Sequence, residues 1–293
     1  MKYGCQSMVE PIGGILMKRP KDAFRSQQYL DDNFQYYGYL EPPNLEVAIE
    51  EYHNFESIIK EFTQKIYHLP FDERAGMDSI YTHDPVKITK KGAIYFQMSK
   101  ELRRGESEAA RDFLESAGVP TLGSIDGEGR MEGGDVVWLS ERVVAIGRGY
   151  RTNDEGIRQF KEIMKDQLDE VIVVPLPHGE GESACLHLMS IISMIDHDLA
   201  VVYAKYMPVF FREYLLNKGI KLIGTNEYEY DYLGTNVLAL SKKKCILLGG
   251  NDIMEKSLED AGMEVYMYHG RNISFLGTGG PTCLTNPIFR GSR

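Results

Sequence analysis

Residues 277–285 read Gly277-Thr278-Gly279-Gly280-Pro281-Thr282-Cys283-Leu284-Thr285. Three glycines and a proline predict a tight turn, because glycine accepts backbone angles that other residues avoid and proline interrupts helices and strands. The turn carries one cysteine, Cys283, which we take as a candidate nucleophile. A cysteine that merely packs within such a turn is the alternative. The decision between the two therefore depends on partners elsewhere in the chain.

Thiol chemistry needs a histidine that moves protons and a carboxylate that orients it. His187 lies in a mostly apolar stretch over residues 183–194, which predicts either a helix or a strand. Glu132 precedes two glycines and an apolar strand, so a charge stands where the backbone can approach a ligand closely. Asp84 is a further acid, although its Asp-Pro pair is also common in turns. Two adjacent arginines, 103 and 104, could grip a carboxylate or simply be solvated.

The composition narrows the class of protein. The chain has 293 residues, a hydrophobic content of 43% and a net charge of −10. The apolar content predicts a globular protein with a buried core, and the negative charge argues against nucleic-acid partners, which need clustered cations. No stretch has the length and apolarity of a signal peptide or a membrane span, so we expect a cytoplasmic protein without a membrane partner.

The cysteines show no metal or disulfide pattern. Cys5, Cys185, Cys245 and Cys283 lie far apart in the chain. Zinc sites and small disulfide frameworks use short paired spacings, which are missing here. We therefore expect reduced thiols.

Short strands and helices alternate along the chain. Apolar residues recur at helical spacing over residues 44–64, and short strands are predicted at residues 80–82, 93–98 and 132–139. From residue 132 onward, two strands, a helix and a strand follow one another, and this succession recurs. No change in composition marks a linker, so we predict an α/β fold in a single domain over residues 1–293. Dinucleotide and phosphate-loop glycine motifs are missing, which argues against nucleotide binding.

Residues 21–38 form a polar segment rich in tyrosine. We predict a long loop here. Such a loop could fold over a site as a lid, or its aromatic side chains could pack beneath it.

Four motifs in order along the chain resemble the guanidine-modifying superfamily of arginine deiminases, dimethylarginine dimethylaminohydrolases and amidinotransferases. They are Glu132-Gly133-Gly134-Asp135, Arg151-Thr152-Asn153, Leu186-His187-Leu188 and Gly279-Gly280-Pro281-Thr282-Cys283-Leu284-Thr285. The resemblance implies a five-bladed, pseudo-symmetric α/β propeller, the pentein fold, around a central site.

The resemblance also implies roles for individual residues. It assigns Cys283 as the nucleophile, His187 as the general acid and base, and Glu132 as the carboxylate that engages both His187 and the substrate. Asp84 would bind the guanidinium, while Arg104 and Arg151 would hold the α-carboxylate of the substrate. Tyr81 and Asp135 complete the substrate-binding set, although Asp135 is better suited to securing its own turn.

The implied reaction suits a guanidinium. Carboxylates orient the flat cation, the thiolate attacks its carbon, and a covalent thiouronium is hydrolysed to a ureido product, citrulline from an arginine. No metal or organic cofactor is expected, and the partner is a small guanidino molecule.

The substrate within the superfamily is less defined. Arginine deiminases and amidinotransferases usually carry an acid two residues after the histidine, where this chain has Met189. A thioether there favours an N-substituted guanidine, as in dimethylarginine dimethylaminohydrolases. His83 and Pro281-Thr282 also depart from residues common in the superfamily. Arginine deiminase, arginine dihydrolase, amidinotransferase and a non-catalytic binding protein of the same fold stay open, as does a homodimer.

Overall fold

Five three-stranded sheets form the β structure of the chain in a computed structural model, which describes residues 1–63, 65–179, 181–184 and 186–291. The strand orders are β15-β1-β2, β3-β4-β5, β6-β7-β8, β11-β10-β9 and β12-β13-β14. In every sheet the middle strand is antiparallel to one neighbour and parallel to the other. The fold is therefore α/β and built from one repeated unit.

The strands are β1 (Ile12–Met17), β2 (Ile66–His68), β3 (Val86–Thr89), β4 (Gly92–Tyr95), β5 (Thr121–Ser124), β6 (Val136–Ser140), β7 (Val143–Arg148), β8 (Glu170–Pro175), β9 (Ile192–Asp196), β10 (Leu199–Val202), β11 (Lys221–Gly224), β12 (Leu238–Ser241), β13 (Lys244–Leu248), β14 (Glu264–Tyr268) and β15 (Asn286–Arg290). The helices are α1 (Pro20–Ala23), α2 (Gln27–Tyr37), α3 (Leu45–Phe62), α4 (Gly105–Ser116), α5 (Asp154–Met164), α6 (Val209–Asn217), α7 (Glu227–Asp231) and α8 (Asp252–Asp260).

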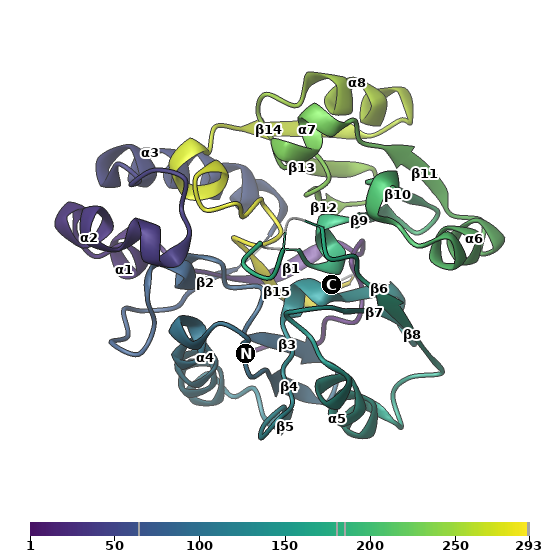
Figure 1. Ribbon diagram of the computed structural model, residues 1–293, viewed down its shortest axis with the longest axis horizontal. Helices are drawn as coiled ribbons and strands as arrows, with labels where there is room; N and C mark the ends of the chain where they lie inside the picture. Colours follow the sequence, from purple (N-terminus) through teal and green to yellow (C-terminus); the bar gives the residue numbers. More distant parts are fainter. Residues whose placement is uncertain (64, 180, 185, 292–293) are drawn as a thin grey trace.

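Each unit consists of an antiparallel strand pair, a helical crossover and a parallel third strand. Helices α4, α5, α6 and α8 make the crossover in four sheets, and α1 to α3 make it in the fifth. That fifth sheet joins the two ends of the described chain, because β15 pairs with β1. The sheets surround the middle of the molecule, with the helices on the outside (Figure 1). The predicted alternation of strand pairs and helices is confirmed.

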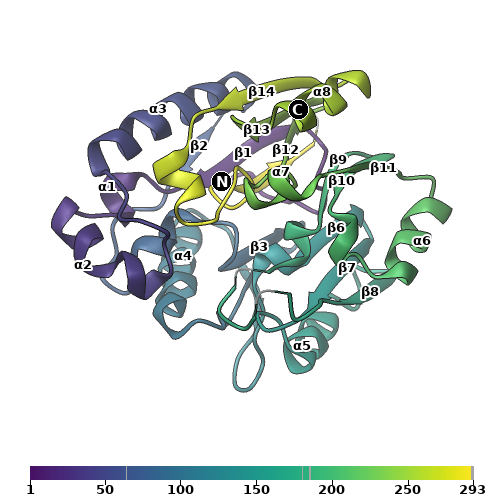
Figure 2. The ribbon, with the colours of Figure 1, turned by 45° about the horizontal axis from the view of Figure 1, so that its top comes forward.

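Helix α3 shows why the helical units lie on the outside. Its side chains Ala48, Tyr52, Phe55 and Ile59 are buried at helical spacing, while its other face meets solvent. Asn44 begins the helix, because its side chain accepts a hydrogen bond from the Val47 N–H. This agrees with the predicted helix over residues 44–64. Helices α1, α2 and α3 lie together on one side of the molecule in both ribbon views (Figure 2).

Two predicted elements are wrong. Residues 80–82 do not form a strand: a buried 3-10 turn, η1 (Met77–Ile80), occupies this position, and the strand β3 begins only after Pro85. The segment 21–38 is largely helical rather than a loop. Ser26 caps the start of α2, and Gly38, with a φ of 80°, ends it in the left-handed conformation that glycine tolerates. Its polar surface misled the prediction, since an exposed helix needs few apolar residues.

Strands β3, β5 and β15 are short and were not predicted, and residues 133–135 form a 3-10 turn, η3 (Gly133–Asp135), ahead of β6. No helix in the described part of the chain is long and apolar enough to cross a membrane.

Candidate active site

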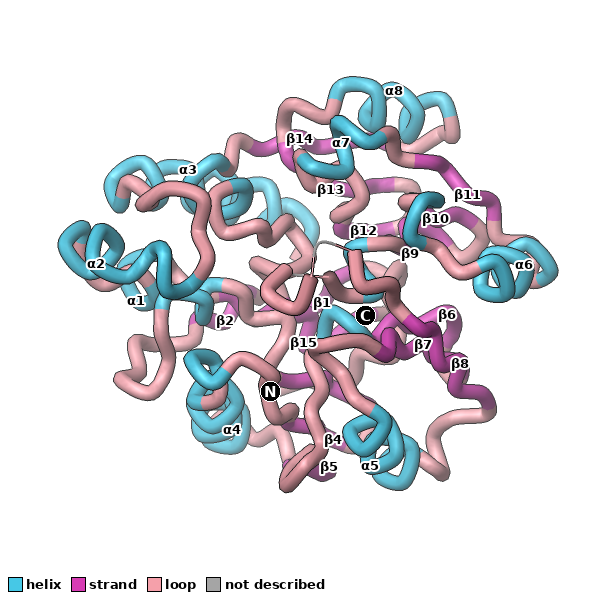
Figure 3. The backbone as a smooth tube through the Cα atoms, viewed as in Figure 1, coloured by secondary structure: helices cyan, strands magenta, loops and turns pink. Residues whose placement is uncertain are grey.

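A cavity of about 510 Å³ lies where loops from the repeated units meet. These loops occupy the middle of the molecule, inside the surrounding helices (Figure 3). Five polar side chains of the cavity wall each come from the segment just before the first strand of a different repeated unit: Asp84 before β3, Glu132 before β6, His187 before β9, Asn236 before β12 and Cys283 before β15. The repeat therefore explains how residues distant in sequence converge.

Glu132 and His187 form a buried, hydrogen-bonded pair. The Glu132 Oε2 and His187 Nε2 atoms lie 2.8 Å apart, and the side chains are 1% and 5% exposed. A carboxylate can only accept, so Nε2 carries the proton. Burial would raise the pKa of Glu132, but the hydrogen bond and charge of His187, together with Arg151, lower it to about 2. Glu132 is therefore ionised at neutral pH.

Backbone contacts and a serine hold this pair in place. The backbone N–H and the hydroxyl of Ser99 both donate to Glu132 Oε1, at 2.9 and 2.6 Å. The backbone N–H of His187 donates to Ser190 Oγ at 3.1 Å, within a reciprocal cap of the 3-10 turn η4 (Leu188–Ser190). His187 thus lies in a loop. Of the helix or strand predicted over residues 183–194, the structure has a strand only from Ile192, where β9 begins.

Asp84 is the second buried carboxylate. Its Oδ1 accepts from the Gly134 N–H and its Oδ2 from Arg103 Nη1, both at 2.9 Å. Burial opposes its ionisation, but the charges of His187 and Arg103 hold its pKa below the ordinary range. One ligand atom each from Asp84, Glu132 and His187 lie within 4.8 Å of one another, so the cluster could hold a metal ion or an organic cation.

The two glycines of the Glu132 motif permit this closeness. A Cβ on Gly134 would lie 2.6 Å from His187 Nδ1, and a Cβ on Gly133 would lie 2.2 Å from the His83 carbonyl oxygen. Neither distance is tolerable for a methyl group. The glycines therefore let the imidazole and the Asp84 loop pack directly on the backbone.

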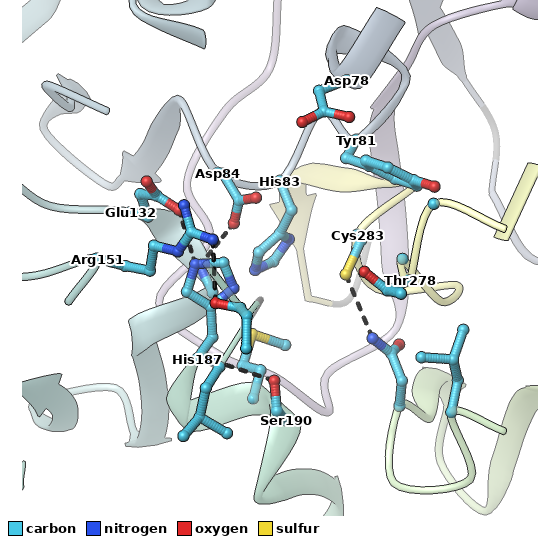
Figure 4. A pocket seen from close by; sticks show the side chains of 18 of the residues that line it. Asp78, Tyr81, His83, Asp84, Glu132, Arg151, His187, Ser190, Thr278 and Cys283 are labelled. Atoms are coloured by element: carbon cyan, nitrogen blue, oxygen red, sulfur yellow. Dashed lines mark hydrogen bonds and ion pairs between the residues drawn. The ribbon is translucent and has the colours of Figure 1, made fainter. Parts of the chain in front are cut away.

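Cys283 lies across the cavity from these groups (Figure 4). Its side chain is half-buried, and Asn236 Nδ2 donates to its Sγ at 3.3 Å. The glycines of its turn again permit close packing: a Cβ on Gly279 would lie 2.3 Å from the Tyr81 ring. Thr278, beside the sulfur in Figure 4, has a left-handed φ of 57°, which is unusual for a β-branched residue. Cys185 lies outside the described residues.

The arginines differ from the prediction. Arg151 is 4% exposed and lines the cavity, where its Nη2 donates to the Ala184 carbonyl at 3.1 Å. Arg104 is not in the cavity wall: its side chain is 53% exposed and pairs with Glu101 at 3.6 Å. Its neighbour Arg103 lines the cavity instead and is 5% exposed. Arg103 ends the 3-10 turn η2 (Glu101–Arg103) and Arg104 follows it, and their side chains point in different directions, which the sequence does not reveal.

The two remaining predicted residues lie in different surroundings. Tyr81 lines the cavity and is 4% exposed. Asp135 is fully buried outside the cavity wall, where it accepts from Thr152 Oγ1 at 2.6 Å and from the Leu188 N–H at 2.9 Å. It fastens the segments that carry Glu132, Arg151 and His187 to one another. Sequence reasoning missed Ser99 and Asn236, whose surroundings hold no motif; the repeated unit itself is the only signal for Asn236.

Comparisons with known proteins agree with this arrangement. Residues 77–217 match the arginine deiminase family. The chain is 28% identical to YkgA, an uncharacterized protein of Bacillus subtilis, over 99% of this chain and 96% of that protein. It is 29% identical to an arginine deiminase of Rhodococcus jostii, over 55% of this chain and 46% of that enzyme. It is also 29% identical to N(G),N(G)-dimethylarginine dimethylaminohydrolase of Pseudomonas aeruginosa, over 55% of this chain and 60% of that enzyme. The chain therefore spans about half the length of these two enzymes.

Solved structures share the fold. The dimethylarginine dimethylaminohydrolase of Pseudomonas aeruginosa, a cysteine-to-serine mutant with citrulline, gives a TM-score of 0.76 at 22% identity, over 94% of this chain and 99% of that one. The N-terminal domain of ArgZ, a cyanobacterial arginine dihydrolase bound to product, gives 0.80 at 18% identity, over 96% and 99%. Taken together, the sequence matches and the shared fold make the chain similar to proteins of the guanidine-modifying superfamily, which includes arginine deiminases, dimethylarginine dimethylaminohydrolases and amidinotransferases.

Proposed function

We propose that this chain is a cysteine-dependent hydrolase that cleaves a C–N bond at the guanidinium carbon of arginine or an N-substituted arginine. One observation carries the proposal: two buried carboxylates and a histidine line one side of a cavity, and a half-buried thiol lines the other. Asp84 and Glu132 are both ionised at neutral pH. They offer a flat cation the paired acceptors that a guanidinium prefers.

Substrate binding prepares the nucleophile. The guanidinium lies between Asp84 and Glu132, with its carbon facing Cys283. Its positive charge and the N–H of Asn236 both favour the thiolate, so the thiol releases its proton as the substrate enters. Attack then requires no metal, because the carboxylates have already oriented the electrophile.

The covalent steps use His187 twice. Sulfur attacks the guanidinium carbon, and His187, which has taken up the proton released by the thiol, gives this proton to the departing nitrogen, which leaves as an amine. A thiouronium on Cys283 remains. The imidazole then takes a proton from water, the resulting hydroxide adds to the carbon, and the C–S bond breaks. The products are a ureido compound and the regenerated thiolate.

Cationic side chains support recognition of an amino-acid end. Lys100, Arg103 and Arg151 all line the cavity. Arg103 is already committed to Glu106 and Asp84, at 2.8 and 2.9 Å. Arg151 donates mainly to backbone carbonyls, and within the described part of the chain its Nε has no partner. We assign the contact with the α-carboxylate to Arg151, with Lys100 beside it, and not to Arg104.

The wall next to His187 is apolar. Leu186, Met189 and Tyr206 line the cavity and belong to one apolar cluster. A nitrogen that carries methyl groups fits this wall, whereas an unsubstituted nitrogen would leave N–H groups without acceptors. We therefore place an N-alkylated arginine first, giving citrulline and an alkylamine. Hydrolysis of arginine with release of ammonia is the second candidate, which the match to the arginine deiminase family favours.

We also propose that the five units close into a five-bladed propeller in one catalytic domain over residues 1–293. The pairing of β15 with β1 supports this closure, since it joins the first and last units in one sheet.

A substrate screen tests the function. Purified protein is incubated with arginine, monomethylarginine, dimethylarginine, agmatine and guanidino acids, and ureido product, ammonia and alkylamine are each measured. We expect ureido product and alkylamine from a methylated arginine. Ammonia from arginine alone would instead support the second candidate. Product that forms only when an acceptor amine such as glycine is added would overturn hydrolysis, and no product from any guanidine would overturn the enzyme proposal.

A further inference from the structure

A second, smaller cavity of about 20 Å³ lies behind the turn that carries Cys283. His83 and Thr282 line both this cavity and the large one, so they form the partition between them. Its remaining wall comes from β3, β6, β12 and β15, which are edge strands of four sheets, and from the N-terminal segment. The cavity therefore lies near the centre of the fold, where the sheets converge.

Two buried cations line this small cavity. Lys87 and Arg290 are 5% and 7% exposed. Within the described residues, neither has a carboxylate within ion-pair distance, whereas the buried Arg103 pairs with both Asp84 and Glu106. Arg290 donates to the backbone carbonyls of Glu10 and Ala239, at 2.6 and 2.9 Å, and the thiol of Cys5, which lines the same cavity, lies within hydrogen-bond reach of it. A buried charge without a counter-charge raises the free energy of the folded state. An anion bound between the two cations would remove this cost.

The acceptor that Lys87 contacts is the neutral imidazole of His83. His83 Nδ1 lies 2.9 Å from the Thr285 carbonyl, which can only accept, so Nδ1 carries the proton. Nε2 then accepts from Lys87 Nζ, at 2.5 Å. Burial, reinforced by Lys87, lowers the pKa of His83 to about 3, so the ring is neutral. Lys87 keeps two further N–H groups, and burial lowers its pKa to about 8.

A third donor belongs to the same wall. Trp138 is 3% exposed, and its indole Nε1–H has no hydrogen-bond partner in the described part of the chain. An indole N–H can only donate. Two cations and an unpartnered neutral donor around one small space are the surroundings that an anion requires.

We propose that the small cavity binds a monovalent halide-sized anion, chloride in solution, held by Lys87, Arg290 and Trp138. The volume admits one particle of about the size of a water molecule and leaves no room for a phosphate or a carboxylate-bearing molecule. The site does not depend on the proposed hydrolase function.

The anion supports the turn of the nucleophile. The backbone N–H of His83 donates to the Cys283 carbonyl at 3.3 Å, and Thr282 Oγ1 donates to Asn236 Oδ1 at 2.7 Å. Both partition residues thus connect the anion site to the Cys283 turn. The anion neutralises Lys87 and Arg290 behind the partition. Because it binds the folded state and not the unfolded chain, it stabilises the folded protein by mass action.

Fluorescence provides a direct test, because Trp138 is the only tryptophan of the chain. Protein exchanged into gluconate, an anion too large for the cavity, is titrated with bromide at constant ionic strength. We expect saturable quenching that chloride competes away. The variant Lys87→Met should lose the saturable phase, whereas Lys90→Met, which removes an exposed lysine of the same β-hairpin, should keep it. Quenching that is linear in bromide, and equal in all three proteins, overturns the site.

A crystallographic measurement on the unmodified protein covers the case in which Lys87→Met does not fold. Crystals grown in bromide should give an anomalous peak between Lys87 Nζ, the Arg290 guanidinium and Trp138 Nε1. Chloride at about 100 times its Kd should also raise Tm by roughly 5 °C or more relative to gluconate. A cavity that holds only water, without an anomalous peak, contradicts the proposal.

Discussion

The two sides of the large cavity are built differently. On one side Asp84, Glu132 and His187 are each 5% exposed or less, and each side chain has a hydrogen-bond partner within 3 Å. On the other side Cys283 is half-buried and stands on a turn rich in glycine, where Asn236 contacts its sulfur. The acid and imidazole side is rigid and closed, and the thiol side is open to the cavity.

This difference matches what each side must do. A cation is held most strongly by charges that are already oriented and shielded from water, since they need no rearrangement when it arrives. A nucleophile must be reached by substrate and later by water, so it gains from partial exposure. The comparison implies that a small displacement of side chains should reduce activity more on the acid side than on the thiol side. Loss of the sulfur itself is the exception.

Replacing the sulfur should have the largest effect. Cys283→Ser should lower kcat by at least about 1000-fold, because a hydroxyl is a much weaker nucleophile in this setting, while the similar volume leaves Tm nearly unchanged. The measurement is turnover of the best substrate from the screen, with Tm recorded in parallel. Cys245→Ala, a buried cysteine remote from the cavity, is the control and should keep its activity. Substantial turnover by Cys283→Ser would show that another group attacks.

Gly134→Ala should disturb the rigid side most. The added methyl group would lie 2.6 Å from His187 Nδ1, so the imidazole must move away from Glu132. A shift of about 1 Å in a catalytic group costs roughly 100-fold in rate, and we expect a loss of this order in kcat. The rate of alkylation of Cys283 by a haloacetamidine should change less, because the thiol side keeps its geometry.

Gly224→Ala is the matched control for this variant. A Cβ at Gly224 meets no atom within 4 Å, and its backbone does not need the left-handed region. It should retain activity within about two-fold of the wild type. Equal losses of turnover and alkylation in Gly134→Ala would contradict the division of the cavity into two independent sides.

Asn236→Ala tests the support of the thiol side and should act more weakly. It removes the donor 3.3 Å from the sulfur and the acceptor of two Thr282 hydrogen bonds, at 3.0 and 2.7 Å. A lost hydrogen bond to a charged group corresponds to about 10-fold, so alkylation of Cys283 should slow by this factor and its pH profile should move to higher pH. Asn226→Ala removes a helix cap of α7 instead and should leave the pH profile in place. An unshifted profile in Asn236→Ala would exclude a direct role for this amide.

The sequence predicted the parts of this molecule that rest on short-range rules. Glycine-rich turns predicted Cys283 and Glu132 as site residues, and the alternation of strand pairs and helices predicted the repeated unit. Contacts between distant segments of the chain have no comparable pattern in the sequence. Asn236 and Ser99 gain their importance only because two distant segments meet beside Cys283 and Glu132. The sequence also could not show which of two adjacent arginines faces the cavity: the resemblance implied Arg104, but Arg103 lines the cavity.

The smallest effect is expected from Arg104→Ala. Its side chain is about half exposed and its ion pair with Glu101 is at the surface, where such a pair contributes little. Activity should stay within about two-fold of the wild type. Arg151→Lys keeps the charge but loses the planar donors that point into the cavity, so KM for the amino-acid substrate should rise by roughly 10-fold with a smaller change in kcat. If agmatine, which has no carboxylate, is turned over, its KM should be insensitive to Arg151→Lys. A large loss of activity in Arg104→Ala would mean that the cavity rearranges around the substrate to include this arginine. The acid side of the cavity would then include exposed residues beyond Asp84, Glu132 and His187.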